Sequence, residues 1–447
     1  MFTSLKLKNY KSLVNVQMDL LKASEPKNIV LLYGENGAGK SNIASAFVTL
    51  MDTLRTLSTK NYIQKLIENN RTSDMDPEEK ANFLDFISDN FKDTEAIIRE
   101  CKTLGSKENM YLEYSFQLNN AVGTYSIEMD EESIVSESLY YLIDKRRGFH
   151  FKLKKGEKAT LNPNIFINSS YYNELIDKIE KYWGKHSLLG IIDNEYKSSN
   201  SKYLLNRVSN NLIEFIRFLH SLSCQVYIGD RGQRRCLAAS HEMFFKLDSG
   251  EIEENKSADI ESVEEFLNEV FTNLYSDIKK VYYKRTKKED RVKYELYFKK
   301  QIGKEMRDVG FKMESRGTLK LLSLIPLIYE AVKGNTVIID EFDSGIHDLL
   351  IQKLILSISE YIKGQLIITT HNTILMESGI SGDSIYFLVV NEFGDKQIAC
   401  LTDYRNRRTH PNNNIRSLYM KGIYDAIPNM IQENINFDEL KEILGDD

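Results

Sequence analysis

Proline, tryptophan and paired cysteines are scarce in this sequence. Only 6 of its 447 residues are proline and 1 is tryptophan, whereas tyrosine and phenylalanine number 25 and 21. This balance favours packed helices and strands over extended linkers. No CxxC pair occurs, which predicts reduced, buried thiols of a cytoplasmic protein instead of disulfides or a zinc site. The four scattered cysteines are Cys101, Cys224, Cys236 and Cys400.

Long apolar runs and an excess of positive charge are also missing. No stretch approaches the roughly 20 apolar residues that cross a bilayer, so we expect neither a membrane span nor a transporter subunit with its own spans. The opening residues alternate between polar and apolar side chains, as in a strand and not in a signal peptide. The formal net charge of −6 gives no global positive field, so any contact with nucleic acid would need a local basic patch.

A phosphate-binding loop is present. Residues 34–41 read GENGAGKS; they follow the apolar run NIVLLYG and precede a segment with helical spacing, the strand–loop–helix context that a P-loop requires. The glycines let backbone N–H groups turn toward phosphate, and the helix N-terminus adds positive potential. We expect Lys40 to reach the β- and γ-phosphates of ATP and the Ser41 hydroxyl to coordinate Mg²⁺. The predicted nucleotide contacts are Asn36, Gly37, Ala38, Gly39, Lys40, Ser41 and Asn42.

Two carboxylates end a second apolar run. VIIDEFD, residues 337–343, has the form of a strand that delivers acids to the ligand-binding edge of an open α/β sheet. We expect Asp340 to hold Mg²⁺, directly or through water, and Glu341 to polarise the attacking water as a general base. Taken alone, a strand that ends in two acids is usually a strand that meets solvent. Because a P-loop is also present, we favour a catalytic role for these two acids.

A histidine follows a third apolar strand, in TTHN at residues 369–372. Glu341 and His371 are 30 residues apart (371 − 341), which leaves room for one helix and one strand between them. The two strands are therefore expected to be neighbours. We predict that His371 reaches the γ-phosphate and the attacking water.

The order of elements predicts an α/β fold with a mixed sheet. We place the nucleotide-binding core in residues 1–57 and 301–402. Residues 58–300 are predicted to form an insertion between the P-loop and the acidic strand, made of an antiparallel β meander from Met110 and of helices. A basic tail with a short helix is expected over residues 403–447. No sustained heptad pattern occurs, which argues against a long coiled-coil arm in the insertion.

The P-loop, the acidic strand and the histidine together resemble ABC-type ATPase heads, in particular the structural-maintenance, Rad50-like and RecF-like subgroup. In those heads the P-loop and the acidic strand lie far apart in sequence. The opening FTSLKLKNYKSL looks like their first strand, whose basic-aromatic segment lies near the nucleotide. Tyr10 and Lys11 are therefore candidates for the adenine contact, which stays open.

ABC heads also carry a signature helix, usually S-G-G-Q, that acts in trans. ESRGTLKLLSLIPLI, residues 314–328, stands in the corresponding place, where Ser315 and Gly317 match and Arg316 and Thr318 depart from the pattern. The resemblance implies that Ser315 and Gly317 contact the γ-phosphate held by a second copy, so that ATP joins two heads. The alternative interpretation is a capped helix start.

Over nearly its whole length the chain is similar to the AAA_15/AAA_21-type family of prokaryotic ATPases. The meander, YWGKHSLLGI at residues 182–191, DEFDSGIH and the ending NIRSLYMKGIY carry this likeness. It implies a Mg²⁺-dependent ATPase that dimerises around ATP as sensor and scaffold for a separately encoded effector, such as a Toprim-type nuclease, in abortive-infection or other anti-phage defence. A phage product is the possible trigger. The alternative is a RecF-like DNA-binding ATPase of repair or maintenance.

Local basic segments leave nucleic acid open as a partner. Residues 279–300 hold ten Lys or Arg among three acids, which fits either a nucleic-acid surface or a solvated turn between a helix and a strand; we favour the turn. Two smaller clusters could bind an anionic partner or a trigger protein. They consist of Arg231, Arg234 and Arg235, and of Arg405, Arg407 and Arg408.

Overall fold

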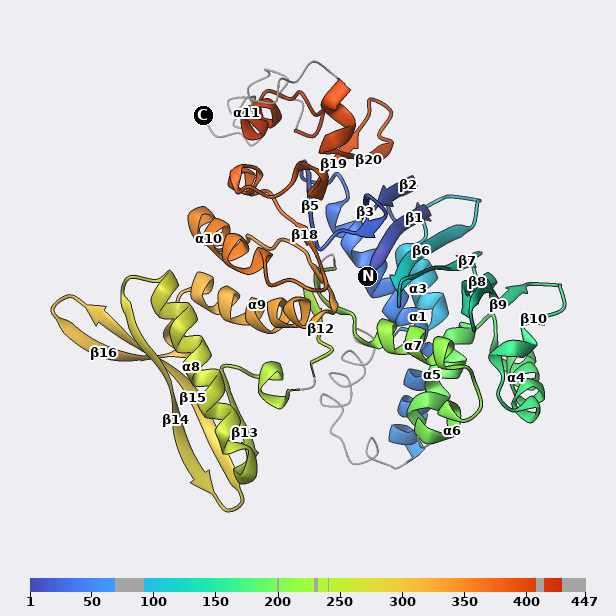
Figure 1. Cartoon of the computed structure of the whole chain (residues 1–447), viewed down its shortest axis with the longest axis horizontal. Helices are drawn as coiled ribbons and strands as arrows, with labels where there is room; N and C mark the ends of the chain where they lie inside the picture. The colour runs from blue at the N-terminus through green and yellow to red at the C-terminus, as the bar shows by residue number, and fades with distance from the viewer. Residues whose placement is uncertain (69–91, 199–200, 229–231, 240, 407–413, 428–447) are drawn as a thin grey trace, which may run out of the picture.

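The computed structural model of the chain describes residues 1–68, 92–198, 201–228, 232–239, 241–406 and 414–427 (Figure 1). Two seven-stranded sheets and one four-stranded sheet contain all but two of the described strands; the remaining pair is β3 (Leu21–Lys22) with β4 (Glu25–Pro26). The predicted class, α/β with a mixed sheet, an antiparallel meander and a helical insertion, is confirmed.

The first seven-stranded sheet, here called the site sheet, has the order β12-β11-β17-β18-β5-β19-β20. Its five inner strands are parallel, and β12 and β20 pair antiparallel at the edges. The central strands are short apolar runs because helices or strands cover both of their faces. The strands are β5 (Ile29–Gly34), β11 (Ser223–Tyr227), β12 (Gln233–Cys236), β17 (Thr336–Ile339), β18 (Gln365–Thr369), β19 (Ile385–Val390) and β20 (Lys396–Cys400).

The second seven-stranded sheet, the meander sheet, is antiparallel throughout, with the order β10-β9-β8-β7-β6-β1-β2. Alternating burial along MYLEYSFQL in β6 shows the period-two pattern of a strand with one covered face. The pairing of β1 with β6, in which Leu5 lies opposite Tyr114, joins the N-terminal hairpin to the meander. The strands are β1 (Phe2–Tyr10), β2 (Leu13–Asp19), β6 (Met110–Leu118), β7 (Ala121–Met129), β8 (Ile134–Ile143), β9 (Arg146–Lys154) and β10 (Thr160–Leu161).

Helix α1 (Lys40–Glu68) lies between these two sheets. Phe47 belongs to one buried cluster together with Leu5 of β1 and Leu32 of β5. The opposite face of the site sheet is covered by α9 (Arg316–Lys333) and α10 (Asp348–Ser359), which Figure 1 shows on the far side of β5 and β18 from α1. The helix that follows the P-loop is thus fixed in the largest core of the protein.

The helical part of the insertion packs on α1 and the meander. Its helices are α3 (Thr94–Cys101), η1 (Pro163–Ile165), α4 (Ser169–Tyr182), α5 (Leu188–Ser198), α6 (Ser201–Leu205) and α7 (Asn210–His220). The buried carboxylate of Glu137 on β8 accepts hydrogen bonds from the Leu188 and Leu189 N–H groups at the start of α5, at 2.6 and 3.3 Å, and from Trp183 Nε1 and Tyr125 Oη, at 2.9 and 3.0 Å. Burial raises the pKa of Glu137, and these four hydrogen bonds oppose the rise.

A third sheet projects beside α8 (Ser257–Leu274), as Figure 1 shows. Its strands are β13 (Ser249–Glu253), β14 (Ile278–Lys288), β15 (Arg291–Ile302) and β16 (Glu305–Gly310). The predicted solvated turn within residues 279–300 is wrong where β14 lies, because this strand pairs with β15 in a hairpin. Val281 and Tyr283 of β14 and Phe298 of β15 are buried in one cluster with α8. These apolar residues among the lysines stabilise the strands by packing in the core.

The predicted domain boundaries do not follow the elements of the structure, and the boundary after residue 57 falls inside α1. Strands β11 and β12 fall in the predicted insertion, yet they extend the site sheet next to β17. The boundary after residue 300 falls inside β15. The first difference arises because β11 pairs with β17, a segment far away in the chain, and such pairing leaves no local signal in the sequence.

The remaining described elements complete the C-terminal third. They are η3 (Glu242–Phe245), η4 (Glu254–Lys256), η5 (Phe311–Met313), η6 (Thr373–Glu377), η7 (Gly382–Ser384), η8 (Leu401–Asn406) and α11 (Ile415–Met420). Much of the predicted tail lies outside the described residues. All four cysteines are free thiols, and Cys236 is partly exposed while the others are buried. Within the described ranges, no helix has both the length and the apolar character that a bilayer crossing requires.

Replacement of Glu137 by alanine is expected to destabilise the fold. It would leave the Trp183 donor and two backbone N–H groups buried without their acceptor, at a cost of about 3 kcal/mol in the free energy of unfolding. Urea denaturation measures this. Glu132→Ala, an exposed carboxylate just before the same strand, is the control and should change the value by less than about 0.5 kcal/mol. Equal effects of the two substitutions would contradict the anchoring role of Glu137.

Candidate nucleotide site

The predicted phosphate loop connects β5 to α1 with three glycines at positive φ. Gly34, Gly37 and Gly39 have φ of 158°, 79° and 110°. A Cβ on Gly34 would lie 2.8 Å from the Leu388 carbonyl oxygen of neighbouring β19, whereas a Cβ on Gly37 would meet nothing within 4 Å. Gly34 therefore packs the loop against the sheet, and Gly37 leaves open space at its tip, where a phosphate could approach the backbone.

Lys40 begins α1 and points back into the loop. Its buried ammonium donates to the carbonyl oxygens of Gly34, at 2.9 Å, and Glu35, at 3.0 Å. Burial lowers the pKa of Lys40 to about 8, while the charges of the acids Asp340, Glu341, Asp343 and Glu35 oppose this fall. The predicted phosphate lysine thus lies within electrostatic reach of the acidic strand end.

A second lysine holds the loop from outside. Lys396 of β20 donates to the Gly37 carbonyl oxygen at 3.1 Å and to Ser12 Oγ at 2.6 Å, and Asn42 Nδ2 donates to the same Ser12 Oγ at 2.7 Å. The turn between β1 and β2 therefore touches the phosphate loop. Sequence reasoning missed Ser12 and Lys396, because neither stands in a motif.

Asp340 follows β17 and is fully buried. Its Oδ1 accepts a hydrogen bond from the Thr369 hydroxyl, at the end of neighbouring β18, and its Oδ2 accepts from the Tyr227 N–H at 3.3 Å. The Thr369 hydroxyl oxygen in turn accepts from the Glu341 N–H at 2.9 Å. Because β17 and β18 are parallel and in register, Ile339 opposite Ile368, both ends arrive at one edge of the sheet.

Glu341 and His371 lie at this same edge. Glu341 is exposed and has a left-handed backbone, with φ 48°, a conformation that costs a non-glycine residue about 1 kcal/mol or more. The His371 N–H donates to Asp343 Oδ2 at 3.3 Å. Burial and the positive charge of Lys40 lower the pKa of His371, and Asp343 and Asp340 raise it; since the net direction is downward, the imidazole is neutral near pH 7.

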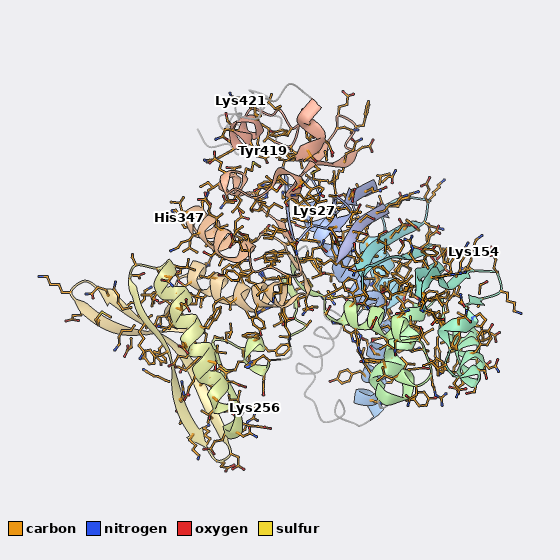
Figure 2. The ribbon with its side chains drawn as sticks, viewed as in Figure 1. Lys27, Lys154, Lys256, His347, Tyr419 and Lys421 are labelled. Atoms are coloured by element: carbon orange, nitrogen blue, oxygen red, sulfur yellow. The ribbon has the colours of Figure 1, made fainter. Side chains whose placement is uncertain are left out.

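The predicted signature residues stand at the start of α9. Ser315 is the N-cap, and its Oγ accepts from the Thr318 N–H at 3.2 Å, so the capped helix start is confirmed. A Cβ on Gly317 would lie 2.8 Å from the Gly345 carbonyl oxygen, which places α9 against the loop after the acids. His347 ends that loop and caps α10 through Nδ1, which accepts from the Leu349 N–H (Figure 2). The trans contact of Ser315 and Gly317 stays a prediction.

The residues present fit ATP and Mg²⁺. The loop offers open backbone space at Gly37, and Ser41 is the second residue of α1. Asp340 is a buried carboxylate whose described partners are neutral hydrogen-bond donors, so its negative charge is available to a hard cation. Ser41 and Asp340 are the residues that would hold Mg²⁺, and the P-loop residues would hold the phosphates.

The structure gives other candidates from the sequence structural contacts instead of a place at the nucleotide. Tyr10 is fully buried, and its hydroxyl contacts Ser45 and Thr49 of α1, so it cannot stack on adenine from the surface. Lys11 donates to Ser45 Oγ at 2.9 Å. Arg234 forms an ion pair with Asp52 and is structural. Outside the described residues lie Arg231, Arg407 and Arg408, together with the side chain of Arg405.

Residue Tyr33 shows how the end of β5 is supported. It precedes the P-loop, its hydroxyl donates to the Asn372 carbonyl oxygen at 3.1 Å, and its ring lies 6.0 Å from that of Tyr419 (labelled in Figure 2). Tyr33 therefore joins the P-loop strand to TTHN and to α11. The predicted ending that contains Tyr419 is thus close to the site in space.

Comparison with known proteins gives one family. The model described as "AAA domain, putative AbiEii toxin, Type IV TA system" matches residues 29–377, a span that contains the P-loop, α9, the acidic strand and His371. No curated protein matches the sequence.

Among solved structures, SMC heads are similar. The SMC head domain from Thermotoga maritima has 14% identity and a TM-score of 0.38, with 89% of this chain and 98% of that chain covered. An SmcHead bound to the C-winged helix domain of ScpA has 14% identity and a TM-score of 0.43, with 89% and 97% covered. An Smc head domain with an extended coiled coil, bound to the C-terminal domain of ScpA derived from Pyrococcus furiosus, has 14% identity and a TM-score of 0.42, with 91% and 98% covered.

Thr369→Val is expected to lower the rate of ATP hydrolysis at least tenfold. The substitution keeps the shape of the side chain but removes the donor to the buried Asp340 carboxylate, an interaction worth about 1.5–3 kcal/mol. Thr336→Val is the matched control, because the Thr336 hydroxyl is equally buried but has no hydrogen-bond partner among the described residues. Steady-state phosphate release measures both, and equal rates for the two variants would contradict the role of Thr369.

Proposed function

The chain belongs to the AAA_21 family, and from this premise we propose that it is a Mg²⁺-dependent ATPase whose ATP-linked dimer controls a separate effector protein in anti-phage defence. Family membership supports a nucleotide-binding ATPase. One observation carries the hydrolytic part: in-register parallel pairing of β17, β18 and β5 brings the P-loop and the acidic strand end to one edge of the sheet, although 300 residues (340 − 40) separate Lys40 from Asp340.

The proposed reaction follows from the groups at this edge. Lys40 exchanges the carbonyl oxygens of Gly34 and Glu35 for the β- and γ-phosphate oxygens of ATP, which are stronger acceptors because they are charged. Mg²⁺, when bound at Ser41 and Asp340, supplies further charge neutralisation on the phosphates. Glu341 takes the proton of the attacking water, and neutral His371 orients that water and the γ-phosphate by hydrogen bonding.

The proposed dimer depends on the start of α9. This helix has 18 residues, and its first N–H groups carry positive partial charge. Ser315, Gly317 and exposed Arg316 present that end at the surface, where the γ-phosphate of a second copy could accept from it. Two composite sites would then form, each with the P-loop of one copy and the helix start of the other.

The control of an effector rests on the family likeness. ATP would favour the closed dimer and hydrolysis the open one, so an effector that binds only one of them is switched by nucleotide. A Toprim-type nuclease is the effector class we propose, with a phage product as trigger, in the cytoplasm.

A second candidate function is ATP-dependent DNA binding, favoured by the β14–β15 hairpin. Lys280, Lys284 and Lys288 of β14 are exposed, and the rings of Tyr282 and Tyr297 stack 6.0 Å apart between them. Lysines beside aromatic rings suit the phosphates and bases of nucleic acid.

Glu341→Gln is expected to trap an ATP-bound dimer. The amide cannot accept the proton of water, so ATP should still bind while turnover falls by about 100-fold or more. Size-exclusion chromatography with light scattering, with and without ATP, measures the mass. Adding Arg316→Glu should return the monomer at unchanged ATP affinity, because its carboxylate would repel the partner's γ-phosphate; Lys181→Glu, the same charge change on exposed α4, should not.

Lys40→Ala should abolish ATP binding, and a Lys40→Ala protein with ordinary affinity would refute the phosphate site.

Copurification with the protein encoded beside it tests the scaffold. We expect a complex whose stability depends on ATP and is strengthened by Glu341→Gln. Absence of any association, together with nanomolar DNA binding that weakens steeply with salt, would refute the scaffold and support the second candidate.

A further inference from the structure

Lys320 on α9 carries a buried ammonium that the proposed reaction does not use. Its Nζ is shielded from solvent and has no hydrogen-bond partner among the described residues. It lies 5.6 Å from the centre of the Tyr227 ring. An ammonium buried without a partner is unfavourable by several kcal/mol unless negative charge lies near. The role of Lys320 therefore depends on the charged groups around it.

The negative charges that act on Lys320 are those of the acids of the candidate site. Burial lowers the pKa of Lys320, and the negative charges of Glu341, Asp343 and Asp340, in that order, oppose the fall. The path between them is short: the Tyr227 N–H donates to Asp340 Oδ2 at 3.3 Å, and the Tyr227 ring faces Lys320. Tyr227 ends β11, the strand next to β17, so the ammonium comes to the acidic loop from the α9 side of the sheet.

The other charged groups at this edge approach from different elements. Lys40 on α1 binds carbonyl oxygens of its own loop, and His371 follows β18. The titratable groups on which the charges of Asp340, Glu341 or Asp343 act are Lys11, Tyr33, Lys40, Tyr227, Lys320 and His371. Of the three lysines among them, Lys320 is the one on α9, opposite the phosphate loop.

We propose that Lys320 is a positioning residue that holds the Glu341 carboxylate by charge attraction and so ties the acidic loop to α9 of the same chain. The proposal rests on the proposed function for the role of Glu341. It has a geometric consequence. Lys320 is the fifth residue of α9, about one turn beyond Ser315. Through Lys320, the helix that would contact the partner's nucleotide is therefore coupled to Glu341, the water-activating group of its own site. Glu341 itself is exposed in a left-handed conformation, and a nearby ammonium restricts where its carboxylate can lie.

A double-mutant cycle on the nucleotide-free, metal-free protein tests the attraction directly. Glu341→Ala should lower the thermal unfolding midpoint, because it removes the first countercharge of a buried ammonium, whereas in a Lys320→Met background it should not. We expect a coupling of at least roughly 2 °C between the two sites. Additive shifts in midpoint would overturn the proposal without reference to activity.

Kinetics separate positioning from a structural role. Lys320→Met should lower kcat about tenfold or more and leave the affinity for ATP within about twofold, and Lys320→Arg should restore most of kcat. Combined with Glu341→Gln, Lys320→Met should cause no further loss, since both act through one group. Lys312→Met, an exposed lysine before α9, is the control and should behave as the unmodified chain.

The outcomes distinguish the two proposals. A chain that hydrolyses ATP, with a Lys320→Met variant of ordinary kcat, refutes Lys320 as a positioning residue and leaves the ATPase intact. A chain that neither binds nor hydrolyses ATP refutes the proposed function, while the nucleotide-free cycle still decides whether Lys320 and Glu341 attract each other.

Discussion

The Thr369 hydroxyl donates to Asp340 and accepts from the Glu341 backbone, and this pair of hydrogen bonds joins the ends of two parallel strands. The candidate site depends on that junction. Without it, the fully buried carboxylate would keep, among the residues that the structure describes, a single hydrogen bond of 3.3 Å from the Tyr227 N–H, and the left-handed turn at Glu341 would lose a backbone partner. In-register pairing of β17, β18 and β5 makes the junction possible, since it brings three distant loops to one edge.

Charge is arranged around the junction from several sides. Lys40 comes from the P-loop and Lys320 from α9, and both have pKa values lowered by burial and supported by the same acids. Each is held near the negative charge but by a different element, so movement of α1 or of α9 changes the field at Asp340 and Glu341. The proposed control of an effector by nucleotide would require such a link between chemistry and a movable surface.

How much could be predicted differs between the loops and their surroundings. The P-loop, the acidic strand end and TTHN are local patterns, each a strand followed by a special turn, and the structure has these strands as predicted. Thr369 lies inside the recognised TTHN motif, but the sequence assigned it no role. Its hydrogen bond to Asp340 could be predicted only if the order of the strands were known. Strand β14 was mistaken for part of a turn, since its core-facing Val281 and Tyr283 are flanked by lysines that dominate the composition.

The sequence by itself determined the phosphate loop and the nature of the reactive groups, because glycine conformation, lysine charge and carboxylate chemistry act within a few residues. Only the tertiary structure decided which groups meet: Ser12 and Lys396 at the loop, Tyr227 and Thr369 at Asp340, and Lys320 at the Tyr227 ring. These contacts join residues that are dozens to hundreds of positions apart. They are fixed by parallel strand pairing and by the packing of α9 on β11, and neither leaves a periodic or local trace in the chain.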